Sequence, residues 1–533
     1  MKHLCISLGH NSSAILIEDG KVLCGYEHER LTHIKSDSQF PFMAIRKCLE
    51  NQRLTPDDIK CIYVSHWELL GDFTKMSAKH YEPDYLTRTF PNATVISLSK
   101  EFTHHDAHYW SAKAFAGKPF KYGIVADGFG TFGENLTIYK DDQVIFRSFG
   151  FGSSLGLLYQ YATAYLGMTM NQDEYKLLGY ESTIQDILSW EDYSILKDEI
   201  KKWSHKFFTE IIGYDSDVKF DPMCGLTALP EIRLDYVKRF DRVLKSLGIH
   251  KFDAPARVVI GHFVQSIVES VITKLVDKYK MPEVLLSGGL FYNVKLNNAI
   301  AKLDCVESIC IFPLCGDQGA ALGVYEYVNH DLVIEDFYWG HRDDVSGLPA
   351  LYLDSKTDNV TKILFDLIND DKILNIVHGS MEFGPRALCN TSTIARPTKK
   401  NIDYINMLNS RSTIMPMAPV ITDPYKFFDS KMIQKVWKSL EFMIITLDYV
   451  TLPVEYLGAA HRYPGKTMWS GRPQVLGKSH VLYGLVEKVG MLINTSLNLH
   501  GKPIIFSKGD IEFTFNTHRE LDIENRVVNI IIQ

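Results

Sequence analysis

One pattern of apolar and polar positions opens the chain and sets the expected fold. Apolar residues predominate at His3–Leu8, and two further apolar runs, Ala14–Ile17 and Val22–Tyr26, follow a polar stretch. The pair Asp19-Gly20 separates these two runs, and such a pair is a strong signal for a two-residue hairpin turn. The pattern therefore predicts a strand, a polar turn and a hairpin.

The same pattern returns about a hundred residues later. An apolar strand at Tyr122–Asp127 precedes a glycine-rich turn and two apolar runs, Leu136–Tyr139 and Val144–Arg147, around Asp141-Asp142. Repetition of one supersecondary unit indicates internal duplication. The expected fold class is α/β, and the duplication resembles the actin, Hsp70 and sugar-kinase ATPase fold, in which two such turns face one nucleotide across a cleft.

Helical periodicity marks residues 154–166 and 254–280. Polar residues interrupt the longer of these segments, so we expect a packed core helix and no membrane span. Its apolar side chains recur at helical spacing, at Ile260, Val264, Ile267, Val271 and Leu275.

Two later strands end in glycine-rich turns. Strand 283–286 ends in Ser287-Gly288-Gly289, and strand 308–312 leads through Gly316 and Asp317 into a helix over 319–327. A strand, a glycine-rich turn and a helix N-terminus together bind phosphate through backbone N–H groups and the helix dipole. These turns are candidate nucleotide-binding segments, although Gly-Gly turns are also common without a ligand.

A change in composition separates two expected domains. Residues 330–357 mix charge, glycine and proline without periodicity, which is typical of a connecting segment. We place the boundary so that residues 1–345 form the duplicated domain and residues 346–533 form a smaller α/β domain.

Composition narrows the class of protein further. Of 533 residues, 46% are hydrophobic and 23% are charged, as in ordinary globular proteins, which excludes a disordered chain, a collagen-like fibre and a coiled coil. The net charge of −7 gives no global positive field for nucleic acid or membrane, and a local basic groove stays open. Nine cysteines without a CxxC pair suit reduced thiols. The first residues are not typical of a signal peptide, so we expect a cytoplasmic protein, in a bacterium or a phage-infected host cell.

Two histidines one helical turn apart are the sharpest chemical signal. If Thr103 caps a helix, His104 and His108 lie on one face and can share a metal. Asp127 and Asp317, each at the end of a strand, could supply carboxylates, a set that suits Fe(II), Zn(II) or Mn(II) acting as a Lewis acid. The alternatives are surface or capping histidines and, for Asp317, a helix N-cap.

The second domain contains three cations in otherwise apolar surroundings, Arg386, Arg411 and Arg472. An unpaired buried charge is expensive, and no single neighbouring carboxylate is an obvious partner for all three. A site for phosphate or carboxyl groups and a set of buried salt bridges are equally good explanations.

Three polar segments have weaker signals. Asp173–Lys176 is either part of a site or a solvated turn with a local ion pair. Asn293 could bind a ribose or an adenine, or cap a helix. Asn494–Asn498 is either a turn or a second anion-contacting loop.

Taken together, the motifs resemble the NodU/CmcH-type O-carbamoyltransferases, a family that carbamoylates hydroxyl groups of antibiotics and nodulation factors. The motifs that carry this resemblance are ordered along nearly the whole chain. They are Gly9–Ala14, Glu27–Arg30 with Lys35, His104–His108, Ala126–Gly128, Asp173–Lys176, Ser287–Gly289, Gly316–Gly323, Met381–Leu388, Gly471–Gln474 and Asn494–Asn498.

The resemblance implies an enzyme with two sites. A C-terminal YrdC-like domain would make carbamoyl-adenylate from carbamoyl phosphate and ATP with Mg²⁺. An N-terminal domain similar to the tRNA threonylcarbamoyl-transferring ATPase would pass the carbamoyl group to an acceptor hydroxyl, on a natural-product sugar or on 5-hydroxymethylcytosine in DNA. Fe(II) or another divalent metal would be held by His104, His108 and Asp317 with Asp127 close by, and His10 would be the general base beside Asp127. The expected cofactor-binding residues are Gly128, Lys176, Ser287, Gly288, Gly289, Asn293, Gly316, Arg386, Arg411, Arg472, Asn494 and Ser496.

Some positions depart from the family pattern and bear on donor use. Cys389, Thr391, Asn409 and Met415 replace a glycine and three cations, while Arg396 and the pair Lys399-Lys400 are candidates to compensate.

Other functions stay open. They are a threonylcarbamoyl-type tRNA modification enzyme and a non-catalytic ATPase-fold scaffold. A segment rich in lysine and aromatic residues could stack an extruded base beside the metal, or be an ordinary solvated loop. Its residues are Trp67, Lys75, Lys79, Tyr81 and Tyr85.

Overall fold

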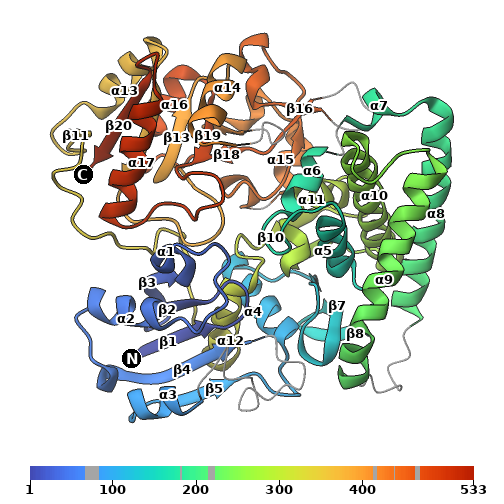
Figure 1. Cartoon of the computed structure of the whole chain (residues 1–533). Helices are drawn as coiled ribbons and strands as arrows, with labels where there is room; N and C mark the ends of the chain where they lie inside the picture. The colour runs from blue at the N-terminus through green and yellow to red at the C-terminus, as the bar shows by residue number, and fades with distance from the viewer. Residues whose placement is uncertain (67–82, 181–182, 214–221, 412–416, 437, 463–468) are drawn as a thin grey trace.

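The computed structural model describes the whole chain except residues 67–82, 181–182, 214–221, 412–416, 437 and 463–468. In the described part, the strands form two five-stranded sheets, a seven-stranded sheet and a small three-stranded sheet (Figure 1). The protein is therefore of the mixed α/β class, as predicted.

The two five-stranded sheets have the same topology. Their orders are β3-β2-β1-β4-β5 and β8-β7-β6-β9-β10. The central strand, β1 or β6, pairs antiparallel with the next strand of the chain, β2 or β7, and parallel with β4 or β9. The duplication predicted from the repeated pattern is present in these pairings. The strands of the first sheet are β1 (Lys2–Ser7), β2 (Ser13–Glu18), β3 (Lys21–Glu27), β4 (Ile59–Ser65) and β5 (Thr94–Ser97). Those of the second are β6 (Tyr122–Ala126), β7 (Glu134–Lys140), β8 (Gln143–Phe149), β9 (Glu283–Ser287) and β10 (Ser308–Ile311).

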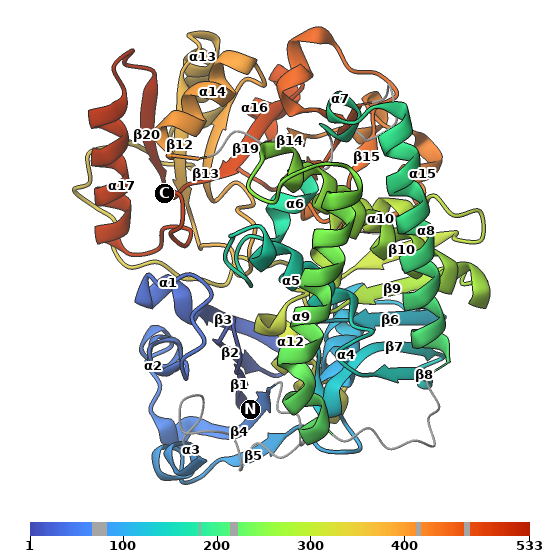
Figure 2. The same ribbon diagram turned by 45° about the vertical axis from the view of Figure 1, so that its right-hand side comes forward.

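Two helices pack against each other between these sheets, α4 (His104–Ala116) and α12 (Ala320–Asn329). Figure 2 shows them side by side, and their backbones approach very closely at Gly323, where an added Cβ would lie 1.8 Å from the Ala107 carbonyl oxygen. The Ser111 hydroxyl lies 2.9 Å from the carbonyl oxygens of both Ala107 and Gly319 and bonds α4 to the start of α12. Glycine is thus required at position 323 by the packing of the two helices.

Helices α8 (Trp190–Ile212), α9 (Pro222–Ser246) and α10 (Ala254–Tyr279) lie together along one side of the second sheet (Figures 1 and 2). Nothing was predicted for α8 and α9, although buried Leu196, Trp203, Phe207 and Ile211 recur at helical spacing. By length and composition α10 could cross a membrane, but 72% of its most apolar window is buried inside the protein. It is packed as a core helix, as its periodicity predicts.

The C-terminal part is built on the seven-stranded sheet, in the order β11-β20-β12-β13-β19-β14-β18. The predicted boundary after residue 345 falls in the connection between α12 and β11. The strands are β11 (Leu351–Leu353), β12 (Ile373–His378), β13 (Thr391–Ala395), β14 (Ala418–Ile421), β18 (Gln474–Val475), β19 (Leu492–Ser496) and β20 (Val527–Ile532). Its longer helices are α13 (Val360–Asn369), α14 (Lys399–Leu408) and α17 (Lys508–Leu521).

Substitution of Gly323 by alanine tests the contact between α4 and α12. The new methyl group would overlap the Ala107 carbonyl, so we expect a loss of about 3 kcal/mol or more in the free energy of unfolding. Urea denaturation followed by circular dichroism measures it. Gly509→Ala in α17 is the matched control, because the nearest atom to its added Cβ is 3.8 Å away. That variant should gain about 0.5–1 kcal/mol. Equal stability of both variants would contradict the prediction.

Candidate functional site

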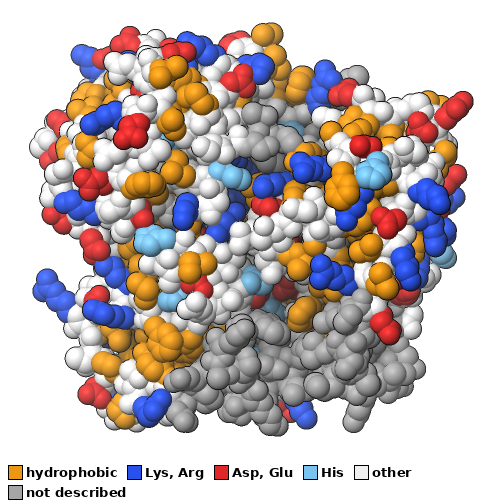
Figure 3. Space-filling view, in the orientation of Figure 1, with side chains coloured by type: hydrophobic (Ala, Val, Ile, Leu, Met, Phe, Trp, Pro, Cys, Tyr) orange, Lys and Arg blue, Asp and Glu red, His pale blue; other side chains and the backbone are white. Residues whose placement is uncertain are grey.

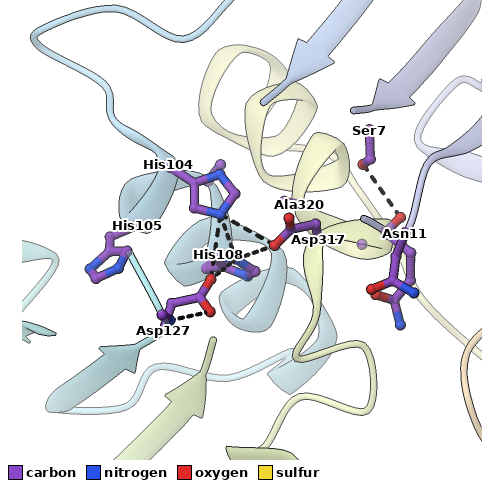
Figure 4. A network of polar contacts seen from close by, with 12 residues as sticks. Ser7, Asn11, His104, His105, His108, Asp127, Asp317 and Ala320 are labelled. Atoms are coloured by element: carbon purple, nitrogen blue, oxygen red, sulfur yellow. Dashed lines mark hydrogen bonds and ion pairs between the residues drawn. The ribbon is translucent and has the colours of Figure 1, made fainter. Parts of the chain in front are cut away.

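Four potential metal ligands converge where α4, β6 and the start of α12 meet. His104, His108, Asp127 and Asp317 offer ligand atoms that all lie within 4.8 Å of one another. Figure 4 shows these four side chains pointing toward one another, with His105 apart from them. The two Nε2 atoms are 3.1 Å apart, and the contacts from each Nε2 to the carboxylate oxygens measure 3.4–3.6 Å. Ligands about 2.1 Å from one metal ion are spaced by about 3.0–3.4 Å in octahedral or tetrahedral geometry, so the group fits a divalent ion.

The helix start that carries the two histidines is strongly capped. The Thr103 side chain and Asp106 form a reciprocal capping box. Arg147 and Tyr139 donate to Asp106 at 2.7 and 2.6 Å, and Glu134 accepts the His105 backbone N–H at 2.9 Å. These bonds tie the first turn of α4 to the hairpin β7–β8.

The His104 ring is oriented by a hydrogen bond from the nitrogen that does not face the cluster. His104 Nδ1 donates to the His66 carbonyl oxygen at 2.9 Å, which directs Nε2 at the cluster. His105 instead contacts Thr137 through Nδ1 at 2.8 Å. The first and fifth residues of the motif therefore face the site, as the helical spacing predicts, and the second faces away.

The cluster concentrates charge in a buried place. Burial lowers the pKa of His104, but Asp317 and Asp127 outweigh it and raise this pKa to about 10. Burial raises the pKa of Asp317, and His10 and His104 overcome it, so that the pKa lies well below its usual range. Burial also raises the pKa of Asp127, and the contacts with His104 and His108 overcome it and lower this pKa below its usual range, so both carboxylates are ionised.

The glycine turns bring the backbone close to these ligands. Gly288 has φ +93°, and an added Cβ would lie 2.4 Å from the Ala126 carbonyl oxygen; an added Cβ at Gly289 would lie 3.0 Å from Asp127 Oδ1. Ser287, at the end of β9, is buried, and its hydroxyl has no partner among the described residues.

His10 stands between the cluster and open space. Its Nδ1 contacts the Asn11 side-chain oxygen, and its Nε2 lies 3.7 Å from Asp317 Oδ2. The side chain is 37% exposed and lines a cavity. His10 is therefore accessible from the cavity and adjacent to the cluster, and its role as a general base stays a prediction.

That cavity, of about 410 Å³, lies between the two parts of the chain. Figure 3 shows lysine, arginine and histidine side chains gathered around the boundary between the upper C-terminal part and the lower N-terminal sheets. Many of the predicted site residues line it, namely His10, Asp127, Gly128, Gly289, Asn293, Gly316, Arg386, Arg411, Arg472, Asn494 and Ser496.

Three arginines form the C-terminal wall without a counterion. No described carboxylate pairs with Arg386, Arg411 or Arg472; Arg411 donates to the Thr495 hydroxyl. Burial, followed by repulsion from Arg386 and Arg411, lowers the pKa of Arg472 well below its usual range. Buried salt bridges are therefore not the explanation for these three residues in the described part, and the site for phosphate or carboxyl groups stays a prediction.

Other predicted residues are engaged within the protein. Lys176 pairs with Asp173 at 2.8 Å and does not line the cavity. This is the local ion pair that the sequence predicts as the alternative to a site. Asn293 caps α11 (Val294–Ala301), accepting from the Leu296 N–H at 3.0 Å.

The compensation expected from Arg396 and the two lysines does not occur. Arg396 donates to the Ile368 carbonyl and to Asn369, and neither Arg396 nor the lysines line the cavity. Lys399 and Lys400 pair at the surface with Asp403, Asp371 and Glu524. Each of these cations is therefore engaged away from the cavity.

The other departures have structural explanations where they are described. Cys389 adopts φ +77°, the left-handed region that favours glycine, which agrees with the glycine of the family pattern that the resemblance implies there. Asn409 accepts from His518 at 3.0 Å. Met415 lies outside the described residues.

The aromatic and lysine-rich segment is mostly outside the described residues too. Trp67, Lys75, Lys79 and Tyr81 belong to the part that is not described. Tyr85 packs against Phe40 and Phe42, with ring centroids 5.4 and 4.7 Å apart.

Several cavity residues had no assigned role. Glu27, Glu29, Arg30 and Lys35 line it, and the motif that contains the first three was the available signal. Tyr159, Gln160, Tyr292 and His500 also line it without a recognisable local pattern.

One of the four potential metal ligands, Asp127, lines the cavity between the two α/β parts, and the three arginines line the same cavity. Two family models match the chain, described as "Carbamoyltransferase N-terminus" over residues 88–325 and "Carbamoyltransferase C-terminus" over residues 365–529. The chain belongs to the carbamoyltransferase family, and the protein is a transferase.

Named relatives agree with this family. The chain is 26% identical to nodulation protein NolNO of Sinorhizobium fredii, with 97% of this chain and 78% of the relative covered. It is 27% identical to the 3'-hydroxymethylcephem-O-carbamoyltransferase of Amycolatopsis lactamdurans, over 44% of this chain and 47% of that enzyme. A solved structure, full-length HypF in the phosphate- and nucleotide-bound form, is 14% identical, with a TM-score of 0.31, and covers 62% of this chain and 46% of its own.

Removal of one ligand tests the metal site. His104→Ala should lower the affinity for Fe(II), Mn(II) or Zn(II) by about two orders of magnitude, because even outer-shell partners are worth about 10- to 100-fold. Isothermal titration and metal analysis of the purified protein measure it. His105→Gln, whose ring faces away from the cluster, should bind metal like the wild type. Unchanged affinity in His104→Ala would refute the assignment.

Neutralising one arginine tests the anion site. Arg472→Met should leave the free energy of unfolding equal or raise it by about 1–4 kcal/mol, since it removes a buried charge that like charges repel. It should also abolish the rise in melting temperature that inorganic phosphate gives to the wild type. Arg396→Met, which neutralises a cation off the cavity, should keep that rise. A phosphate response retained in Arg472→Met would refute the site.

Proposed function

We propose that this carbamoyltransferase transfers a carbamoyl group from carbamoyl phosphate, by way of carbamoyl-adenylate made with ATP, to an acceptor hydroxyl. The observation that carries the proposal is a single cavity, lined on one side by three uncompensated arginines and on the other by Asp127 and His10. Anionic phosphates suit the first side, and a hydroxyl to be activated suits the second.

The C-terminal part is proposed to form the intermediate. Its fold would be YrdC-like, with Arg386, Arg411 and Arg472 holding phosphate oxygens of the donors. One carbamoyl phosphate, one ATP and one water give carbamoyl-adenylate, pyrophosphate and phosphate. Carbamate is a poor electrophile, and adenylation gives it a good leaving group.

The N-terminal part is proposed to transfer the group. His104, His108, Asp127 and Asp317 would hold Fe(II) or another divalent ion, which when bound supplies Lewis-acid polarisation of a carbonyl. His10 Nε2 takes the proton of the acceptor hydroxyl. The acceptor oxygen then bonds to the carbamoyl carbon, the bond to the adenylate oxygen breaks, and AMP leaves.

The acceptor would be a hydroxyl on a natural-product sugar or the hydroxymethyl group of 5-hydroxymethylcytosine in DNA. The cephem relative, whose name specifies a hydroxymethyl acceptor, supports an acceptor of this chemistry. Transfer of labelled carbamoyl phosphate to a sugar, to the free nucleoside and to hydroxymethylated DNA distinguishes them.

Separating the two half-reactions tests the proposal. Arg386→Ala should reduce formation of carbamoyl-adenylate from carbamoyl phosphate and ATP at least a hundredfold, because the donor phosphate loses a buried cation. The same variant should transfer from supplied carbamoyl-adenylate at close to the wild-type rate. Chromatography of labelled products measures both steps. Equal loss in both would contradict the two-site scheme, and so would a wild-type protein that forms no carbamoyl-adenylate.

A further inference from the structure

The motif Glu27-His28-Glu29-Arg30 has no part in the reaction as described above, yet three of its side chains line the shared cavity. It spans the end of β3 and most of helix α1 (His28–Thr32). Arg30 bonds to two carboxylates at once, to Glu27 at 2.8 Å and to Glu29 at 2.7 Å. Glu27 and Arg30 are each only 4% exposed, so this is a buried ionic group.

The buried pair is bonded to the other part of the chain. Arg30 Nη2 donates to the Gly384 carbonyl oxygen at 2.7 Å, and the Gly384 N–H donates to Glu27 Oε2 at 3.0 Å. Both backbone groups of one residue are therefore held by one ion pair. Gly384 has φ +110°, a conformation that favours glycine, and it stands two residues before Arg386.

The third member of the group reaches a second wall of the cavity. Glu29 Oε2 accepts the Ser36 backbone N–H at 2.7 Å, and the neighbouring Lys35 lines the cavity with its ammonium group 5.6 Å from the Tyr175 ring centre. One guanidinium thus connects the segment before Arg386 with the segment that contains Lys35.

Buried charged pairs are costly to form and costlier to break on one side only. Because Arg30 is buried, its hydrogen bonds are strong. They are also directional, because a planar guanidinium binds in a fixed fork. Such a group contributes geometry more than net stability. Its bonds restrict where the segment 384–386 can lie relative to α1.

We infer that Arg30, paired with Glu27, is a positioning residue that holds the Arg386 segment against the N-terminal part, so that the anion site is complete only when the two parts are docked. The inference rests on the proposed function in one respect, that Arg386 binds a phosphate group.

The test is a variant that removes both charges together, Arg30→Met with Glu27→Gln in the full chain. The glutamine oxygen can still accept from Gly384, and Glu29, which loses its ion pair with Arg30, keeps the hydrogen bond from the Ser36 backbone N–H. We expect the affinity for inorganic phosphate, measured by calorimetry, to fall at least tenfold, and the KM for carbamoyl phosphate to rise by a similar factor. Transfer from supplied carbamoyl-adenylate should stay within about twofold of the wild type. Arg30→Lys, which keeps the cation but not the fork, should lie between the two and serves in place of the double variant if that does not fold.

Arg46→Met is the matched control, because Arg46 pairs with Glu50 on an exposed part of α2 (Phe42–Asn51). It should change neither phosphate affinity nor KM. A folded double variant with wild-type phosphate affinity would overturn the inference, and so would an equal loss in both half-reactions. If the wild type binds phosphate through Arg386 but forms no carbamoyl-adenylate, the proposed function fails while the phosphate titration still decides the role of Arg30.

Discussion

The close contact between the backbones of α4 and α12 is the constraint on which the site depends. The two histidines lie on α4, and Asp317 lies in the turn that starts α12, so their separation is set by how near the helices come. Gly323 has no side chain that would keep the helices apart, and the Ser111 hydroxyl of α4 donates to the Gly319 carbonyl at the same contact. The fourth ligand, Asp127, is placed by β6, which pairs with β9 beside Gly288. Four ligands from three elements thus meet through contacts made of glycine and backbone.

Charged side chains of opposite sign lie on different sides of the cavity, and a bound substrate would supply the counterions that the protein does not. Asp127, with Asp317 behind it in the cluster, lies on one side, and three arginines that pair with no carboxylate of the described residues lie on the other. The arginines repel one another, because buried like charges interact strongly in a medium of low dielectric constant. The two carboxylates are instead offset by the histidines beside them. The surrounding segments are held by hydrogen-bonded groups, among them the capping box of Thr103 and the Glu27–Arg30 pair. Binding of an anion would relieve the repulsion among the arginines.

Local features of the fold could be predicted well from the sequence. The paired hairpins, the cap before His104 and the spacing of the two histidines depend on a few adjacent residues, and periodicity records them directly. Where one residue fits two roles, the sequence did not decide between them. Lys176 and Asn293 matched a cofactor-binding pattern, and they also fitted the local ion pair and the helix cap that the structure contains. Arg396 depends on a distant partner: it was expected near the site, yet the C-terminus of α13 binds it, and no local signal indicates this.

The size of the cavity bears on the order of the reaction. Ligand sites commonly measure about 300–1,000 Å³, and a cavity of about 410 Å³ is near the lower end of that range. A cavity of this size suits one ligand of nucleotide size better than a nucleotide and an acceptor sugar or base together. On the proposed scheme, pyrophosphate and phosphate would leave before the acceptor hydroxyl reaches His10. The adenylated intermediate would then stay between the two parts, where the protein walls limit its contact with water.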